Sequence, residues 1–181
     1  MNFYEKPLSE LSAEEWEKIC MRCGKCCICK YSEGNLIHFS NYICRYFDVK
    51  KGICSCYKTR FNVAKDECKK ISLELLEHEL YLLPPSCAYR RLYEGRGLPP
   101  YHPLLTKDLK SPEKAGQTVK SLPFISEATI EKAVTKMLNK AELKQWEESK
   151  IMHELEKIQH KFELKWLETY PVSEKNEEPA P

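Results

Sequence analysis

The segment Cys20–Cys29, which reads CMRCGKCCIC, holds five of the ten cysteines in this chain of 181 residues. Three of them, Cys20, Cys23 and Cys26, stand three residues apart. Spacing of this C-x2-C kind lets two sulfurs reach one metal ion across a tight turn. Gly24 can form that turn, because a residue without a side chain tolerates positive φ and close approach. The segment therefore predicts a group of metal-bound thiolates.

The rest of the composition favours metal over disulfide bonds as the reason for so many thiols. A cysteine-rich chain is either a secreted disulfide framework or a metal-thiolate protein. The first residues, MNFYEKPLSELSAEEWEK, contain neither a basic n-region nor an apolar h-region, and no apolar run is long enough to span a membrane. We therefore expect a cytoplasmic protein with reduced cysteines and no membrane association. The net charge of +2 is too small to indicate nucleic acid as a partner.

Short helices are expected on both sides of the cysteine-rich middle. Residues 12–20 should form a helix in which Ser12 is the N-cap and Glu15 completes a capping box. Residues 72–84 carry leucines at spacings of three and four, which predicts a second helix. A third should begin after Ser86 as its N-cap.

The middle and the end of the chain differ in character. Residues 24–70 contain many turn-forming interruptions and few apolar runs, which predicts short strands and loops. Residues 126–170 lack cysteine, glycine and proline and show an apolar stripe with helical spacing, which predicts a long helical region with a break between Asn139 and Glu148. The polar, proline-rich residues 171–181 are expected to be disordered.

We therefore predict an α+β fold in three parts. Residues 1–125 form a small, irregular, metal-stabilised domain of short helices and loops. Residues 126–170 form a helical appendage, and residues 171–181 form the tail. We expect the appendage to fold back over the cysteine-rich body rather than to pair with another chain as a short coiled coil, because its tryptophans lie off a strict heptad seam.

The remaining cysteines indicate more than one metal centre. Cys27 follows Cys26 directly, and adjacent side chains diverge, so Cys27 should face a second metal or bridge two. The other thiols lack local partners and must converge in space. Two centres with four ligands each would use eight of the ten cysteines, and His102 offers an additional nitrogen.

Cys87 and two arginines allow alternatives. In the first turn of the predicted helix after Ser86, the Cys87 thiolate would be favoured by the helix dipole. The alternative for Cys87 is a buried side chain that packs as a small hydrophobe. Arg90 and Arg91 are candidates for offsetting the repulsion between thiolates, and the alternative is an ordinary helix-surface salt bridge.

Several motifs together resemble a known family. In order they are ICMRCGKCC, FSNYICRYFD, CSCY, LPPSCAYR, YHPL and AGQTV, and they are similar to the bacterial YcgN-type cysteine-cluster proteins, a family described as zinc- or iron-chelating. The likeness covers about residues 13–127. The resemblance implies a metal-binding domain. One departure is Cys29, which falls where the family pattern does not require cysteine. The region after Ser126 is longer than in the family pattern, which suggests a protein partner for the C-terminal helix.

The residues and the resemblance together give a set of candidate metal ligands. These are Cys20, Cys23, Cys26, Cys27, Cys44, Cys54, Cys56, Cys68, Cys87 and His102. Thiolates suit both zinc and iron-sulfur centres. The C-x2-C-x2-C rhythm with a remote fourth ligand resembles ferredoxins, and zinc ribbons have two separate C-x2-C pairs, which this chain lacks. The pattern favours iron-sulfur slightly over zinc, and multinuclear zinc with bridging thiolates is the alternative.

Three classes of function are compatible with such a protein. In the first class, the metal stabilises the fold, or the protein stores or senses the metal. Alternatively, an iron-sulfur centre can serve a redox enzyme or an electron carrier. The third class is a metal-stabilised module that binds protein or nucleic acid through the basic and tyrosine-rich residues 42–70, although an ordinary solvated surface is favoured there. The sequence carries no nucleophile elbow, phosphate loop or metalloprotease helix motif, so it leaves open whether the protein is an enzyme.

Overall fold

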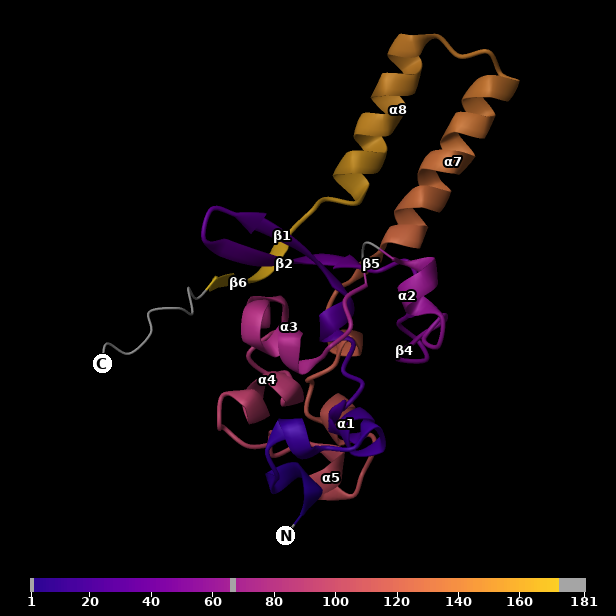
Figure 1. The fold of residues 1–181 in the computed structure, drawn as a ribbon. Helices are drawn as coiled ribbons and strands as arrows, with labels where there is room; N and C mark the ends of the chain where they lie inside the picture. The colour runs from indigo at the N-terminus through magenta and orange to yellow at the C-terminus, as the bar shows by residue number, and fades with distance from the viewer. Residues whose placement is uncertain (1, 66–67, 173–181) are drawn as a thin grey trace.

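The computed structural model describes residues 2–65 and 68–172 (Figure 1). Its mixture of helices and mainly antiparallel strands confirms the α+β class. Short helices gather near the N-terminus, a small sheet lies in the middle, and two long helices project from the other side. Within the described residues, no helix combines the length and apolar character that crossing a membrane requires.

The elements follow one another in an irregular order. The α-helices are α1 (Ala13–Ile19), α2 (Arg60–Val63), α3 (Leu73–His78), α4 (Ala88–Tyr93), α5 (Pro103–Thr106), α6 (Ser111–Lys114), α7 (Glu127–Leu143) and α8 (Glu148–Lys161). The strands are β1 (Ile28–Glu33), β2 (Leu36–Ile43), β3 (Phe47–Asp48), β4 (Ile53–Cys54), β5 (Ile125–Ser126) and β6 (Trp166–Pro171). Short 3-10 turns are η1 (Phe3–Glu5), η2 (Leu8–Glu10), η3 (Lys25–Cys27), η4 (Leu80–Leu82) and η5 (Val119–Ser121).

The short helices α1, α3 and α4 largely follow the sequence predictions. Helix α1 has the predicted capping box, in which the Glu15 main-chain N–H donates to Ser12 Oγ and the Glu15 carboxylate accepts from the Ser12 N–H. The helix predicted over residues 72–84 is shorter, because α3 ends at His78 and η4 follows. The N-cap of α4 is Cys87, one residue later than the predicted Ser86.

Strand β2 is the centre of the main sheet. It pairs antiparallel with β1 along one edge, and along the other it pairs with β5 in parallel and with β6 in antiparallel orientation. Phe39 of β2 lies opposite Glu168 of β6, and Tyr42 lies opposite Ile125 of β5. The segment between β5 and β6 therefore leaves the sheet and returns to the same strand.

The prediction that the helical region continues to residue 170 is wrong. Helix α8 ends at Lys161, and Trp166–Pro171 form β6 instead. This segment is rich in residues that favour strands, and Leu167 and Tyr170 are half-buried against the body. Pro171, expected in the disordered tail, pairs with Leu36. The predicted tail residues 173–181 lie outside the described residues.

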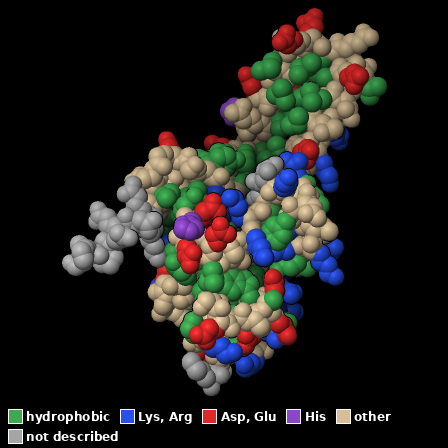
Figure 2. Space-filling view, viewed as in Figure 1, with side chains coloured by type: hydrophobic (Ala, Val, Ile, Leu, Met, Phe, Trp, Pro, Cys, Tyr) green, Lys and Arg blue, Asp and Glu red, His purple; other side chains and the backbone are tan. Residues whose placement is uncertain are grey.

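Helices α7 and α8 form an antiparallel hairpin that projects from the body (Figure 1). The predicted break is confirmed, since the helices are separated at residues 144–147. The expectation that this region covers the cysteine-rich body is wrong, because α7 packs mainly on α8 and on β5. Hydrophobic side chains remain visible along the hairpin in Figure 2, and Leu138, Leu143 and Met152 are exposed. The hairpin partly buries its own apolar stripe and leaves the rest to solvent.

The described residues form two small hydrophobic cores. The first is built from α1, α3, η4 and α4 and includes Ile19, Leu76, Leu83, Cys87 and Tyr89. The second lies against the sheet and includes Ile28, Ile37, Phe39, Ile43, Phe47 and Val119. Because neither core is large, we expect interactions other than apolar packing to contribute to the stability of the domain.

Gly24 lies against the second core at a place where no side chain fits. Its φ is +78°, in the left-handed region. A Cβ at this position would lie 2.5 Å from Cζ of Phe47 and 2.8 Å from Cγ2 of Val119. The sequence indicated a glycine turn for approach to a metal, and the structure adds packing against the second core as a reason for it.

Replacing Gly24 with alanine should destabilise the protein by at least about 2 kcal/mol, because the variant combines left-handed strain with steric overlap. Gly34→Ala is the matched control, since Gly34 also has positive φ but has no atom within 4 Å of its added Cβ. The control should cost about 1 kcal/mol. Urea unfolding of both variants measures the difference, and equal losses would refute the packing role of Gly24.

Ending the chain after Lys165 should destabilise the sheet, because β2 then loses its antiparallel partner β6 and Phe39 loses its edge-to-face contact with Tyr170. A chain ending after Val172 keeps β6 and is the control. We expect a lower melting temperature for the shorter chain only. Equal melting temperatures would mean that β6 does not contribute to the stability of the sheet.

Candidate metal centre

All ten cysteines are free thiols in the structure. Four of them belong to segments around the first core. Cys20 caps the C-terminus of α1, Cys23 lies in the loop that follows, Cys26 lies in η3, and Cys87 is the N-cap of α4. Remote Cys87 is thus brought to the C-x2-C-x2-C segment by the packing of α4 against α1.

These four thiols form a common electrostatic environment. The pKa of Cys20 is raised to about 11 and that of Cys87 to about 12, mainly by burial and in part by the charge of Cys26. Burial and then the charge of Cys26 also raise the pKa of Cys23. Cys20, Cys23, Cys26 and Cys87 are called the first thiol group below.

The predicted helix-terminus effect at Cys87 is present but weak. Nearby main-chain N–H groups of Tyr89 and Arg90 favour the Cys87 thiolate. Burial outweighs them, since Cys87 is buried within the first core. A metal cation would reverse the balance, because a coordinated thiol is deprotonated.

A second group lies on the other side of the Cys26–Cys27 peptide. The sulfurs of Cys54 and Cys56 are 3.6 Å apart at the β3–β4 hairpin. The Cys44 N–H donates to the Cys27 carbonyl at 2.9 Å, and the charge of Cys44 raises the pKa of both Cys27 and Cys56 after larger causes, which include burial at each. Cys27, Cys44, Cys54 and Cys56 are called the second thiol group.

Cys68 and Cys29 lie at the borders of these groups. Burial raises the pKa of Cys68, which also feels the charges of Arg60, Cys26 and Cys54. The pKa of Cys29 is raised to about 12, first by burial and then by the carboxylate of Glu127 at the base of the hairpin. Cys29 therefore faces a carboxylate rather than the first thiol group.

The Cys26–Cys27 pair is the junction between the groups. A hydrogen bond from the Cys27 thiol lowers the pKa of Cys26 and raises that of Cys27. The ammonium of Lys30 favours both thiolates, and it donates to the carbonyls of Cys26 and Ile28 at 2.9 Å each. The sequence prediction did not include Lys30, although its position four residues after Cys26 was a usable signal.

The donor set suits a soft metal ion, because it consists of several thiols gathered from remote segments. Within residues 2–65 and 68–172, no three His, Cys, Asp or Glu side chains are close enough to hold one ion as they stand. The thiols of each group would have to move closer together to coordinate a metal. Thiols are suitable ligands for a soft metal ion, but in the described residues they are too far apart to coordinate one ion together.

Arg90 and Arg91 do not face the thiols. The Arg90 guanidinium binds the carboxylate of Glu94 at 2.8 Å and the carbonyl of Leu83 at 2.7 Å. Arg91 donates to the carbonyls of Gly97 and Arg96. The ordinary salt-bridge interpretation is therefore the one that the structure supports for Arg90.

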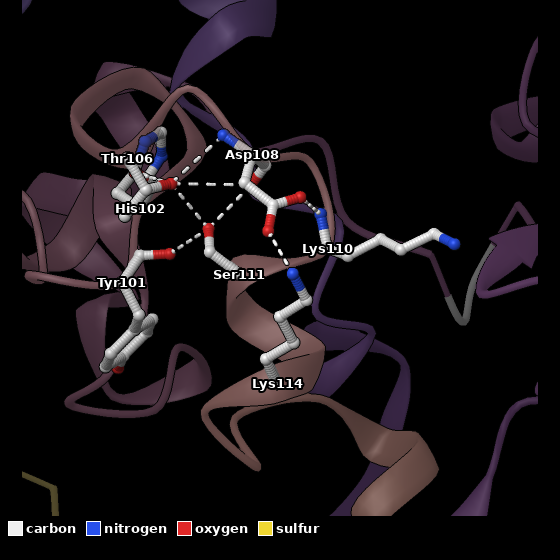
Figure 3. Close-up of polar contacts among 7 residues, drawn as sticks. All are labelled: Tyr101, His102, Thr106, Asp108, Lys110, Ser111 and Lys114. Carbon is white, nitrogen blue, oxygen red and sulfur yellow. Dashed lines mark hydrogen bonds and ion pairs between the residues drawn. The ribbon is translucent and has the colours of Figure 1, made fainter.

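His102 is buried and bonded to the main chain on both ring nitrogens. Nδ1 accepts from the Leu104 N–H at 3.1 Å, so the neutral ring carries its proton on Nε2 and donates to the Ile19 carbonyl at 2.9 Å. Figure 3 shows His102 at the start of α5, beside polar contacts that involve Thr106 and Ser111. In this arrangement His102 fixes the end of α1 just before Cys20, and neither nitrogen points to a metal.

His102→Gln should lower the free energy of unfolding by about 2 kcal/mol at pH 7.5, because two buried hydrogen bonds are lost. Burial lowers the pKa of His102, so the unfolded chain takes up a proton at about pH 6.5 before the folded protein does. The stability of the wild type should therefore fall between pH 7.5 and 5.5, and the variant should lose part of this dependence. Urea unfolding at both pH values checks this, with the exposed His153→Gln as control.

The sequence is similar to several bacterial proteins. The UPF0260 protein of Shewanella pealeana is 43% identical over 117 residues, which cover 64% of this chain and 79% of that protein. The UPF0260 protein of Shewanella denitrificans is 41% identical over 128 residues, 70% of this chain and 86% of the relative. For UPF0260 protein NTHI1811 of Haemophilus influenzae the identity is 38% over 125 residues, with 66% and 80% covered.

No family model matches this chain, and no solved structure matches it significantly. The relatives carry one shared name, and the alignments cover most of their length. By this similarity, the chain belongs to the UPF0260 protein family.

Proposed function

We propose that this protein is a cytoplasmic metal-binding protein with two thiolate centres. The observation that supports the proposal is the pattern of interactions among the thiols. Cys26 acts on Cys20, Cys23 and Cys87. Cys44 acts on Cys27 and Cys56, and Cys54 lies beside Cys56. The first thiol group would hold one centre, and the second thiol group would hold the other. Cys68, which feels both Cys26 and Cys54, is an additional thiol at the border. His102 is not needed as a ligand, because its nitrogens are already bonded.

An iron-sulfur cluster is the preferred occupant of the first thiol group, with zinc as the alternative. Cys20, Cys23 and Cys26 followed by remote Cys87 reproduce the spacing of ferredoxin ligands. This interpretation agrees with the resemblance to the YcgN-type proteins, described as zinc- or iron-chelating. The second thiol group, with its Cys-x-Cys pair, suits either metal.

The main role of the metal would be to hold the fold. The two cores are small, and ten free thiols are distributed over the segments between Cys20 and Cys87. Metal coordination couples directly to folding when ligands come from remote segments. A structural centre would connect α1, α4 and the β3–β4 hairpin.

Electron transfer is the second candidate function. Cys26 is exposed whereas Cys87 is buried, so a cluster in the first thiol group would have one edge near solvent. Such an edge suits electron exchange with a partner.

Nucleic-acid binding is disfavoured, because several of the basic side chains of residues 42–70 have partners within the protein. Lys69 pairs with Glu79 at 3.1 Å, and Arg60 stacks on Tyr57 and Phe61.

Oxygen-protected protein should contain stoichiometric iron or zinc by elemental analysis. Cys23→Ser should lose about half of this metal and Cys44→Ser the other half, because each removes one ligand from one centre. Cys29→Ser is the matched control and should keep all of it. Brown colour with charge-transfer absorption identifies iron-sulfur, and colourless protein that releases zinc identifies zinc.

The proposal is wrong if the wild type carries no stoichiometric metal and still unfolds cooperatively. Two centres are contradicted if Cys23→Ser and Cys44→Ser each lose all of the metal while remaining folded.

A further inference from the structure

Lys25 stands out among the charged residues of the protein. It lies in the C-G-K-C-C segment, and its exposure is 8%. It is the one Lys, Arg, Asp or Glu side chain that is buried in the part of the chain that the structure describes. A buried ammonium is costly unless a negative charge compensates it.

The direct partners of the Lys25 ammonium are neutral. Nζ donates to Ser86 Oγ and to Gln117 Oε1, each at 3.3 Å. Within residues 2–65 and 68–172, no carboxylate lies within 4 Å of this nitrogen. Two long bonds to neutral oxygens orient the ammonium but supply no counter-charge.

Lys25 is linked to two segments that carry thiols of the first thiol group. Cys26 follows it in the chain, and the main-chain N–H of Lys25 itself favours the Cys23 thiolate. Ser86, which holds Nζ, directly precedes Cys87 in the chain. The side chain thus links the turn that carries Cys23 and Cys26 to the segment that carries Cys87.

A filled first centre would supply the missing negative charge. Four thiolates around one divalent zinc ion leave two negative charges, and iron-sulfur clusters with four thiolates are also anionic. We propose that the Lys25 ammonium is the internal counter-ion of the centre formed by Cys20, Cys23, Cys26 and Cys87. This inference rests on the proposed function, since it requires that the first thiol group binds metal.

The other cations near the thiols have different positions. Lys30 is bound to the carbonyls of Cys26 and Ile28, and its charge interacts with the thiols of both groups, Cys26 and Cys87 included. Arg60 stacks on Tyr57 and acts on Cys26 and Cys68. Of these three cations, Lys25 is the one that is buried and whose ammonium is bonded to Ser86, the residue before Cys87.

Two neutral variants separate the charge of Lys25 from its hydrogen bonds. Lys25→Gln keeps a polar end that can bond to Ser86 and Gln117, whereas Lys25→Met keeps only the apolar stem. Metal-loaded proteins, purified without oxygen, are mixed with excess EDTA, and released iron or zinc is followed with time. Both variants should release metal about tenfold faster than the wild type, the size of effect typical of groups that support metal ligands.

Lys25→Arg keeps the charge and should stay within about threefold of the wild-type rate. Lys18→Met is the matched control, because it removes an exposed lysine from the helix that delivers Cys20. It should release metal at the wild-type rate.

The outcomes are separable. If Lys25→Gln and Lys25→Met both release metal at the wild-type rate, the counter-ion role is wrong and the proposed function stands. The same holds if only Lys25→Met releases metal faster than the wild type. A wild type without metal overturns the proposed function and this inference together. If Lys25→Met fails to fold, Lys25→Gln against Lys25→Arg decides the question.

Discussion

The close packing of the Gly24 turn against the second core is the constraint on which the position of the cysteine-rich segment depends. Phe47 and Val119 of that core lie so near that a Cβ on residue 24 would overlap with them. The turn is thus fixed with Cys23 before it and Cys26 and Cys27 after it. Phe47 belongs to β3, and its partner strand β4 carries Cys54. A local backbone requirement therefore holds this segment against the core from which the β3–β4 hairpin extends.

Electrostatics explains why such a domain would need a metal. Burial raises the pKa of Cys20, Cys23 and Cys87, so the free thiols stay protonated and contribute only as small apolar groups. A bound cation converts the same side chains into strong ligands that connect distant segments. The buried Lys25 fits a metal-loaded interior better than a metal-free one. In the metal-free protein the pKa of Cys26 alone is lowered among the first thiol group, and metal binding would add the negative charges of Cys20, Cys23 and Cys87.

The sequence was informative where the signals are local. The capping box of α1, the turn at Gly24 and the interruption between α7 and α8 each depend on residues within one or two turns of chain. The C-x2-C-x2-C spacing likewise predicts that Cys20, Cys23 and Cys26 lie near one another, because residues three apart in a turn are close in space.

Contacts between segments that are far apart in the sequence could not be predicted from such local patterns. Strand β6 follows a segment with a helical pattern, and its partner β2 lies more than a hundred residues earlier in the chain. The local pattern therefore predicts a helix for residues 166–170, because the pairing with β2 leaves no local signal. The division of Cys44, Cys54 and Cys56 from Cys87 depends on how α4 and the β3–β4 hairpin pack. The occupied nitrogens of His102 and the burial of Lys25 are likewise tertiary features, with no sequence pattern of their own.

The most direct test of this account is X-ray absorption spectroscopy at the edge of the metal in oxygen-protected, full-length protein. The account predicts a first shell of about four sulfur atoms at about 2.3 Å around zinc, or a sulfur shell with an additional iron–iron distance for a cluster. A first shell dominated by oxygen or nitrogen would contradict it, because the cysteines would then not be the ligands.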